Sequence, residues 1–184
     1  MRVGAVVLAA GASNRLGEPK QLVRVGTEAL LERTVRVVRE AGCAPVVVVL
    51  GASAEAIRAK CELGEVMIVV NADWAEGMGS SIRVGVEALK DVDACIVMTC
   101  DMPAVTVAHL NSLTAADEIT ASAYAGRRGV PAYFPKRIFP SLMELRGDTG
   151  ARDLLRSARS VELIGGELDV DTVEDLARAR ELFG

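Results

Sequence analysis

Short apolar runs alternate with amphipathic segments along most of the chain. Four of these runs predict buried strands, at residues 3–8, 46–50, 66–70 and 95–99. Between the first two runs, apolar side chains recur at helical spacing over residues 30–41, and Gly42 follows as a residue suited to end a helix. This alternation predicts a mostly parallel sheet covered by helices on both faces, a three-layer α/β/α architecture.

Later elements follow from capping and turn signals. Ser53 is expected to cap a second helix, and Ser80 and Ser81 are expected to precede a third. Two extended segments, 120–124 and 130–134, predict an antiparallel addition to the parallel core, and residues 148–157 and 172–183 predict closing helices. Because no repeat, low-complexity tract or linker interrupts the pattern, we expect one domain over residues 1–184.

Composition narrows the class of protein. The 184 residues are 51% hydrophobic, which excludes a disordered chain, and only six are aromatic. A net charge of −4 gives no general attraction for nucleic acid or an anionic membrane surface, and no apolar run approaches the ~18 residues of a membrane span. The apolar N-terminal segment fits a first strand better than a signal peptide. Four cysteines without a C-x-x-C pair and a single histidine suggest neither disulfides nor zinc, so we expect a cytoplasmic protein.

The loop after the first strand is a candidate phosphate site. It is rich in small residues, which leave backbone N–H groups open to an anion. Arg15 and Lys20 follow in the same loop and together are suited to clamp a polyphosphate. The spacing matches neither the P-loop nor the dinucleotide fingerprint. The alternative is a glycine-containing turn with two solvated cations.

A carboxylate ends the fourth predicted strand. Asp101 stands where ligands bind in open α/β sheets, and Pro103 stops the strand just beyond it. Near a phosphate loop, such a carboxylate suits Mg²⁺, and either Asp169 or Asp171 is a candidate second ligand. The alternatives are a turn role for Asp101 and an N-cap at Asp171 with Glu174 at the third helical position.

Several motifs resemble those of the small MobA-like nucleotidyltransferases, and most closely the molybdenum cofactor cytidylyltransferases. The matching segments are Leu8-Ala-Ala-Gly-Ala-Ser-x-Arg15-Leu-Gly-x-Pro-Lys20-Gln-Leu, Asn71-x-x-Trp74-x-x-Gly77-Met-Gly-Ser-Ser81, Cys100-Asp-Met-Pro103, Gly129-x-Pro131-x-x-Phe134, Gly147-Asp-x-Gly-Ala-Arg152 and Asp169-Val-Asp-Thr-Val-Glu-Asp175-Leu. The chain departs from the usual pattern at Leu16, Ala29 and Val173, none of which is a proposed reacting group.

The resemblance implies a single-domain, Rossmann-like nucleotidyltransferase that moves CMP from CTP to the terminal phosphate of molybdopterin or its molybdenum form and releases pyrophosphate. It implies a nucleotide site formed by Leu8, Ala9, Ala10, Gly11, Arg15, Lys20, Asn71, Gly79, Ser80 and Ser81. Arg15, Lys20 and Asp101 are the implied catalytic residues, and Mg²⁺ would lie on Asp101 and Asp171. A molybdoenzyme that receives the product is a further implied partner.

Two other functions stay open. One is transfer to a different phosphorylated acceptor, such as a sugar phosphate, and the other is a catalytically silent nucleotide- or cofactor-binding chaperone. Gly129 and the 147–152 segment, with Asp148 and Arg152, are candidates to hold the acceptor, although Arg152 also fits a solvated helix face. His109 is given no role, and Trp74 is expected to pack within its loop.

Overall fold

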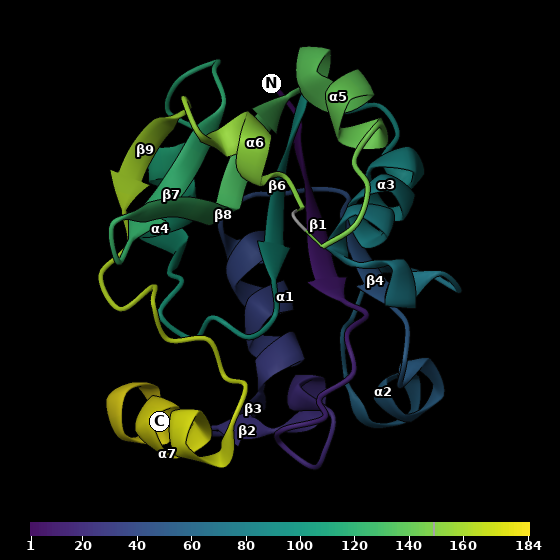
Figure 1. Ribbon diagram of the computed structural model, residues 1–184, viewed down its shortest axis with the longest axis vertical. Coiled ribbons are helices and arrows are strands. Elements are labelled where there is room, and N and C mark those ends of the chain that lie inside the picture. The colour runs from purple at the N-terminus through teal and green to yellow at the C-terminus, as the bar shows by residue number, and fades with distance from the viewer. Residues whose placement is uncertain (149) are drawn as a thin grey trace.

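A seven-stranded sheet forms the centre of the computed structural model, which describes residues 1–148 and 150–184 (Figure 1). The order across the sheet is β5–β4–β1–β6–β8–β7–β9. The strands are β1 (Val3–Ala9), β4 (Val46–Leu50), β5 (Met67–Val70), β6 (Ala94–Thr99), β7 (Thr120–Tyr124), β8 (Arg127–Pro135) and β9 (Arg159–Glu162). Strands β5, β4, β1 and β6 are parallel, whereas β8 is antiparallel to both of its neighbours, so the predicted antiparallel addition is confirmed.

The remaining elements connect and cover these strands. The α-helices are α1 (Leu30–Glu40), α2 (Ala54–Lys60), α3 (Met78–Ala88), α4 (Val107–Leu113), α5 (Phe139–Met143), α6 (Arg152–Leu155) and α7 (Val173–Phe183). Short elements are the 3₁₀ turns η1 (Lys20–Leu22), η2 (Trp74–Glu76) and η3 (Lys136–Ile138) and the two-stranded ribbon β2 (Arg24–Val25) and β3 (Glu28–Ala29). None of the helices in the described part of the chain is long and apolar enough to cross a membrane.

Alternating side chains of the central strands enter two separate cores, as the pleat of a strand requires. On one face, Val7, Val48 and Ile96 pack with residues of α1 and α4. On the other face, strand residues such as Val6 pack with residues of α3, α5 and α6. Figure 1 shows these two helix layers on opposite sides of the sheet. The predicted three-layer α/β/α fold is therefore confirmed.

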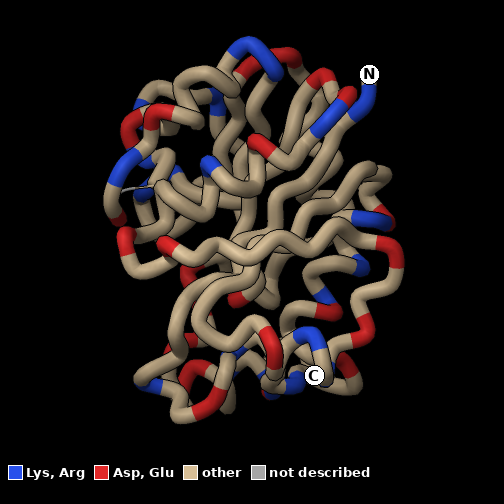
Figure 2. The backbone as a smooth tube through the Cα atoms, turned by 90° about the vertical axis from the view of Figure 1, so that its right-hand side faces the viewer, with Lys and Arg blue, Asp and Glu red and all other residues tan. Residues whose placement is uncertain are grey.

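The central strands carry no charge, which explains why they pair at the middle of the molecule. β1, β4 and β6 contain no Asp, Glu, Lys or Arg, and Figure 2 shows the charged residues mainly on the outer helices and loops. Helix α3 approaches this sheet closely at Gly85, where an added Cβ would lie 2.3 Å from Val6 Cγ1. A glycine is needed at this contact because any side chain would collide with the sheet.

Two capping predictions were wrong, and a third was correct in position only. Helix α3 begins at Met78, so Ser80 and Ser81 lie inside its first turn and bond locally instead of preceding it. Ser53 stands at the N-cap of α2, but its side chain makes no capping hydrogen bond. In α7 the cap is Thr172, with Asp175 rather than Glu174 as its partner, because the helix starts one residue later than the Asp171 cap requires.

The predicted closing helix at 148–157 is shorter than expected. Within the described residues it is helical only over Arg152–Leu155, and Gly147 and Gly150 have positive φ, which interrupts a helix. Thr149, which this prediction includes, lies outside the described residues. The other helix and strand predictions agree with the structure to within a few residues at their ends.

Candidate functional site

Two neighbouring cavities lie at the carboxyl ends of β1 and β6. The first, of about 370 Å³, extends from the predicted phosphate loop (residues 8–20) to the start of α3. Its lining includes Leu8, Ala9, Ala10, Gly11, Lys20, Gln21, Trp74, Gly77, Met78, Ser81 and Asp101. The second, of about 340 Å³, extends toward β8 and the C-terminal segment; its lining includes Lys20, Asp101, Tyr124, Arg127, Arg128, Gly129, Asp148, Arg152, Asp169 and Asp171. Lys20 and Asp101 line both cavities, so the two spaces meet at this pair.

The phosphate loop has a defined conformation. The Lys20 backbone N–H donates to Ser13 Oγ at 2.8 Å, and the Leu16 and Gly17 N–H groups donate to the Ser13 carbonyl. Gly17 has φ +82°, a left-handed conformation that favours glycine. Within the described part of the chain, the N–H groups of residues 11–14 have no protein acceptor, so they stay available to an anion.

The Lys20 ammonium lies between two carboxylates from distant parts of the sequence. Its Nζ donates to Asp101 Oδ2 at 2.8 Å and also to Asp171 Oδ1. Burial alone would lower the pKa of Lys20, but the charges and hydrogen bonds of Asp101 and Asp171 outweigh it and raise that pKa above its ordinary value. Lys20 is therefore a permanent cation at the junction of the two cavities.

Arg15 is placed differently from Lys20. Its guanidinium is 71% exposed and donates to Asp171 Oδ2 at 3.1 Å, so it covers the carboxylate from the solvent side. The three-residue chain of Lys20, Asp171 and Arg15 joins both predicted phosphate-binding cations to one predicted metal ligand. The structure thus brings together the residues Arg15, Lys20, Asp101 and Asp171.

The C-terminal segment reaches the site through backbone bonding. The Val170 N–H donates to the Asp101 carbonyl at 2.9 Å. This bond holds the neighbouring residues Asp169 and Asp171 near the end of β6. The capping box of α7 then fixes the next turn, because the Asp175 carboxylate accepts from the Asp171 and Thr172 N–H groups. Asp171 is directed toward Lys20 by these two constraints.

The carboxylate pair suits a divalent cation. Asp101 and Asp171 are both within hydrogen-bonding reach of a single nitrogen, and Asp101 Oδ1 is buried without a partner within the described residues. Across residues 1–148 and 150–184, no group of three or more His, Cys, Asp or Glu side chains forms a complete metal site. Two carboxylates fit Mg²⁺ or Mn²⁺, which commonly take their remaining ligands from water and substrate phosphates.

Asp169 differs from Asp171 in its surroundings. It lines the second cavity, and its nearest cation is Arg127, whose Nη2 lies 3.9 Å from Asp169 Oδ2. Burial and the nearby charge of Asp101 raise the pKa of Asp169 to about 6. Because Asp171 contacts Lys20 directly and Asp169 does not, the geometry favours Asp171 as the partner of Asp101.

Residues predicted for the ribose and base divide into two groups. Ser81 lines the first cavity. Asn71 and Ser80 are buried and bond within the protein, since Asn71 Nδ2 donates to both serine hydroxyls and Ser80 Oγ lies within reach of the Gly77 carbonyl. The Gly79 N–H donates to the Gly147 carbonyl at 3.0 Å. These three residues lie behind the cavity wall, where they hold the first turn of α3 in place.

Sequence reasoning gave no role to Gln21. This side chain is 2% exposed, and its Nε2 donates to the Ala9 carbonyl at 2.8 Å and the Gly11 carbonyl at 3.3 Å. Its amide thereby ties the turn after Lys20 to the phosphate loop. The available signal was its place beside Lys20 in the first motif, but only the structure shows which carbonyls it bonds.

Two aromatic side chains add to the cavity walls. Trp74 packs against the core on the α3 side and also lines the first cavity, so its predicted packing role is confirmed. Tyr124, which sequence reasoning passed over, lines the second cavity with the Arg127 guanidinium 5.2 Å from its ring centre. Arg127 and Arg128 make the far wall of the second cavity basic.

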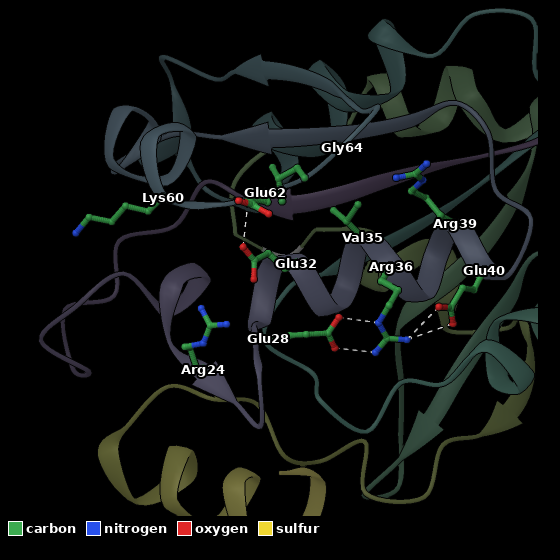
Figure 3. Close-up of a pocket in the computed structure, with 11 residues that line it drawn as sticks. Arg24, Glu28, Glu32, Val35, Arg36, Arg39, Glu40, Lys60, Glu62 and Gly64 are labelled. Carbon is green, nitrogen blue, oxygen red and sulfur yellow. Dashed lines mark hydrogen bonds and ion pairs between the residues drawn. The ribbon is translucent and has the colours of Figure 1, made fainter.

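A larger hollow of about 790 Å³ lies elsewhere, along the outer side of α1 (Figure 3). Its lining carries both signs of charge: Arg36 pairs with Glu28 and Glu40, and Glu32 accepts from the Glu62 N–H. None of the predicted phosphate-binding residues lines it. The hollow therefore contains none of the residues that the sequence predicts for the site.

Comparison with known proteins identifies the family of the chain. A protein-family model described as the MobA-like NTP transferase domain matches residues 5–162. The crystal structure of Rv0371c from Mycobacterium tuberculosis H37Rv in complex with manganese has a TM-score of 0.82 and 31% identity, covering 99% of this chain and 100% of that one.

Two curated relatives have differing names. The chain is 37% identical to nicotine blue oxidoreductase of Paenarthrobacter nicotinovorans, over 96% of this chain and 95% of the relative. It is 34% identical to a probable molybdenum cofactor guanylyltransferase of Opitutus terrae, over 58% of this chain and 52% of the relative. The family is therefore clear, whereas these relatives do not agree on a substrate.

Proposed function

Because this chain belongs to the MobA-like NTP transferase family, we propose that it transfers CMP from CTP to the terminal phosphate of a molybdopterin-type acceptor, releasing pyrophosphate. The observation that carries the proposal is the meeting of two cavities at Lys20 and Asp101. A transfer reaction needs a donor and an acceptor on either side of the group that moves, and this arrangement provides both places.

The first cavity is assigned to the nucleotide. Its loop offers unpaired N–H groups to the phosphates, and Ser81 and Trp74 also line this cavity and are assigned to the ribose and base. Lys20 stands where it can stabilise charge that develops on the α-phosphate, and exposed Arg15 can neutralise the outer phosphates. The donor is thereby held with its α-phosphate facing the second cavity.

The second cavity is assigned to the acceptor. Arg127, Arg128 and Arg152 line it and suit an anionic molecule, while Tyr124 offers an aromatic surface to a planar one. A phosphate monoester is already largely ionised at neutral pH, with a second pKa of about 6. The acceptor phosphate can therefore attack without a general base, which agrees with the absence of a histidine from the lining of either cavity.

Asp101 and Asp171 would hold the divalent ion of the reaction. When bound, such an ion neutralises phosphate charge and makes the α-phosphorus more electrophilic. Without the ion, the same two carboxylates bond the Lys20 ammonium. Asp101 and Asp171 thus interact with both positive charges of the site, the ammonium and the divalent ion.

Pyrophosphate release tests the donor and the acceptor together. The protein is incubated with Mg²⁺ and each of the four NTPs, with molybdopterin, with a sugar phosphate or without acceptor. We expect release only with CTP and molybdopterin. Release with a sugar phosphate alone would overturn the acceptor assignment, release only with GTP would overturn the donor assignment, and nucleotide binding without any release would indicate a binding protein.

The near full-length similarity to nicotine blue oxidoreductase favours a second candidate, an oxidation–reduction with nicotine blue as substrate. This candidate is tested by following the visible absorbance of nicotine blue in the presence of NADH or NADPH. Rapid, protein-dependent bleaching without pyrophosphate release in the first assay would favour the redox function over nucleotidyl transfer.

A further inference from the structure

Lys20 occupies the position between the carboxylates that a divalent ion needs. Its Nζ bonds Asp101 Oδ2 at 2.8 Å and Asp171 Oδ1 at the same time. The Lys20 and Asp101 side chains are only 16% and 15% exposed, so little water screens their contact. An ammonium and a divalent cation on the same two oxygens would lie close together and repel each other, so the two cations compete for this position.

The charge balance of the cluster depends on Lys20. With it, the two carboxylates face two cations, Lys20 and Arg15. Without it, both carboxylates rely on the guanidinium of Arg15, which is mostly solvated and contacts only Asp171. Two close, half-buried carboxylates with too little countercharge attract any available cation strongly.

The Lys20 ammonium can reach a second position, in the first cavity. It lines both cavities, so its ammonium can leave the carboxylates toward a phosphate in the first cavity. The backbone there is held by the bond from Lys20 N–H to Ser13 Oγ and by the Gln21 amide. The flexible four-carbon stem of lysine allows the ammonium to move while the loop stays in place.

We propose that Lys20 fills the metal site until the nucleotide arrives, so that the nucleotide and the divalent ion enter together. The phosphates draw the ammonium away from Asp101 and Asp171 and thereby free the carboxylates for the ion. The nucleotide step of this inference rests on the proposed function, whereas the competition between Lys20 and a metal ion does not.

Mn²⁺ binding tests the competition directly. Mn²⁺ affinity is measured by electron paramagnetic resonance, without nucleotide, for the wild-type chain, Lys20→Met and the control Lys90→Met, an exposed lysine after α3. We expect Lys20→Met to bind Mn²⁺ at least about tenfold more tightly than the wild type, and Lys90→Met to match the wild type. Adding Asp101→Asn to Lys20→Met should abolish the gain. Equal Mn²⁺ affinity of the wild type and folded Lys20→Met would overturn the proposal.

The wild-type chain provides a second measurement that needs no variant. The ¹⁵N-ammonium resonance of Lys20 is followed by NMR during titration with Mg²⁺ alone and then with Mg²⁺ and CTP. We expect the resonance to stay unchanged up to millimolar Mg²⁺ and to shift only when CTP is added. A shift with Mg²⁺ alone would overturn the proposal that the ion enters only together with the nucleotide. Failure of the proposed function is read separately, as absence of pyrophosphate release.

Discussion

At the scale of single residues, the site depends on polar atoms whose partners are few and defined. Asp101 uses Oδ2 to bond Lys20, whereas its Oδ1 is buried without a partner among the described residues. A buried carboxylate oxygen with no partner costs free energy unless a ligand satisfies it. This asymmetry separates Asp101 from exposed carboxylates in surface ion pairs, which contribute little to stability.

Asp101→Asn is expected to lower kcat by about 10²-fold or more while the fold is retained. The amide keeps the size of the side chain but removes the negative charge that pairs with Lys20 and would hold a divalent ion beside the transferred phosphate. Pyrophosphate release gives the rate, and circular dichroism checks the fold. The matched control is Asp153→Asn, an exposed aspartate paired with Arg156, which should leave the rate unchanged. Unchanged turnover in Asp101→Asn would refute its catalytic assignment.

Gln21→Met is expected to lower the free energy of unfolding by about 1–3 kcal/mol, because two carbonyls of the phosphate loop lose their donor. The loosened loop should also raise KM for the nucleotide more than it lowers kcat. Gln21→Glu is the companion variant: it keeps the shape but turns a carboxylate toward the carbonyls, so it should destabilise the protein further. Urea unfolding and initial rates measure these effects; a Glu variant as stable as the wild type would contradict the role given to the amide.

At the scale of elements, the site depends on how helices and strands end. The strands were predictable because uninterrupted apolar runs such as residues 46–50 have few alternatives to a buried strand. Helix starts were less predictable: around α7, Asp171, Thr172 and Asp175 are all acceptable capping residues by type. Local sequence does not choose among them. In the folded chain Thr172 is the cap and bonds reciprocally with Asp175, and the Val170 N–H bonds the Asp101 carbonyl just before it.

Thr172→Ala is expected to destabilise the protein by about 1 kcal/mol, because the side chain of Thr172 accepts from the Asp175 N–H and bonds the Asp175 carboxylate. Thr172→Ser keeps the hydroxyl and should retain most of this stability. Urea unfolding of the three proteins measures the difference. If Ala and Ser destabilise equally, the methyl group and its packing, not the cap, would be responsible.

At the scale of the whole molecule, the sequence predicted the fold more fully than the site. The three layers follow from alternating apolar and amphipathic segments, and the residues Arg15, Lys20, Asp101 and Asp171 were all identified as candidates. Their contacts join positions 81 and 151 residues apart, and no local pattern specifies such pairs. Likewise, only the fold shows that Asn71 and Ser80 lie behind the cavity and that Gln21 connects the loop to η1.

Stability toward acid is a property of the whole fold to which its one histidine contributes. His109, on α4, is buried, and its Nε2 lies 2.7 Å from Ser122 Oγ, which in turn donates to the Pro131 carbonyl. Burial lowers the pKa of His109 below its ordinary value of 6.5, with a smaller opposing effect from the Glu162 backbone. The folded state therefore binds this proton less readily than the unfolded chain.

The sign of the pH effect follows from this difference. The neutral histidine makes its full contribution to stability above about pH 6.5, and the contribution is lost as the pH falls from 6.5 through the lower pKa of the folded state. In His109→Gln, whose amide keeps a donor for Ser122, this loss should disappear. Unfolding free energies at pH 5, 6, 7 and 8 are compared for the two proteins.

Asp169 also titrates near pH 6, but it contributes equally to both proteins and cancels in the difference. The stability advantage of the wild type should therefore be constant at pH 7 and 8 and shrink toward pH 5; a difference independent of pH would mean that His109 is not held neutral by the fold.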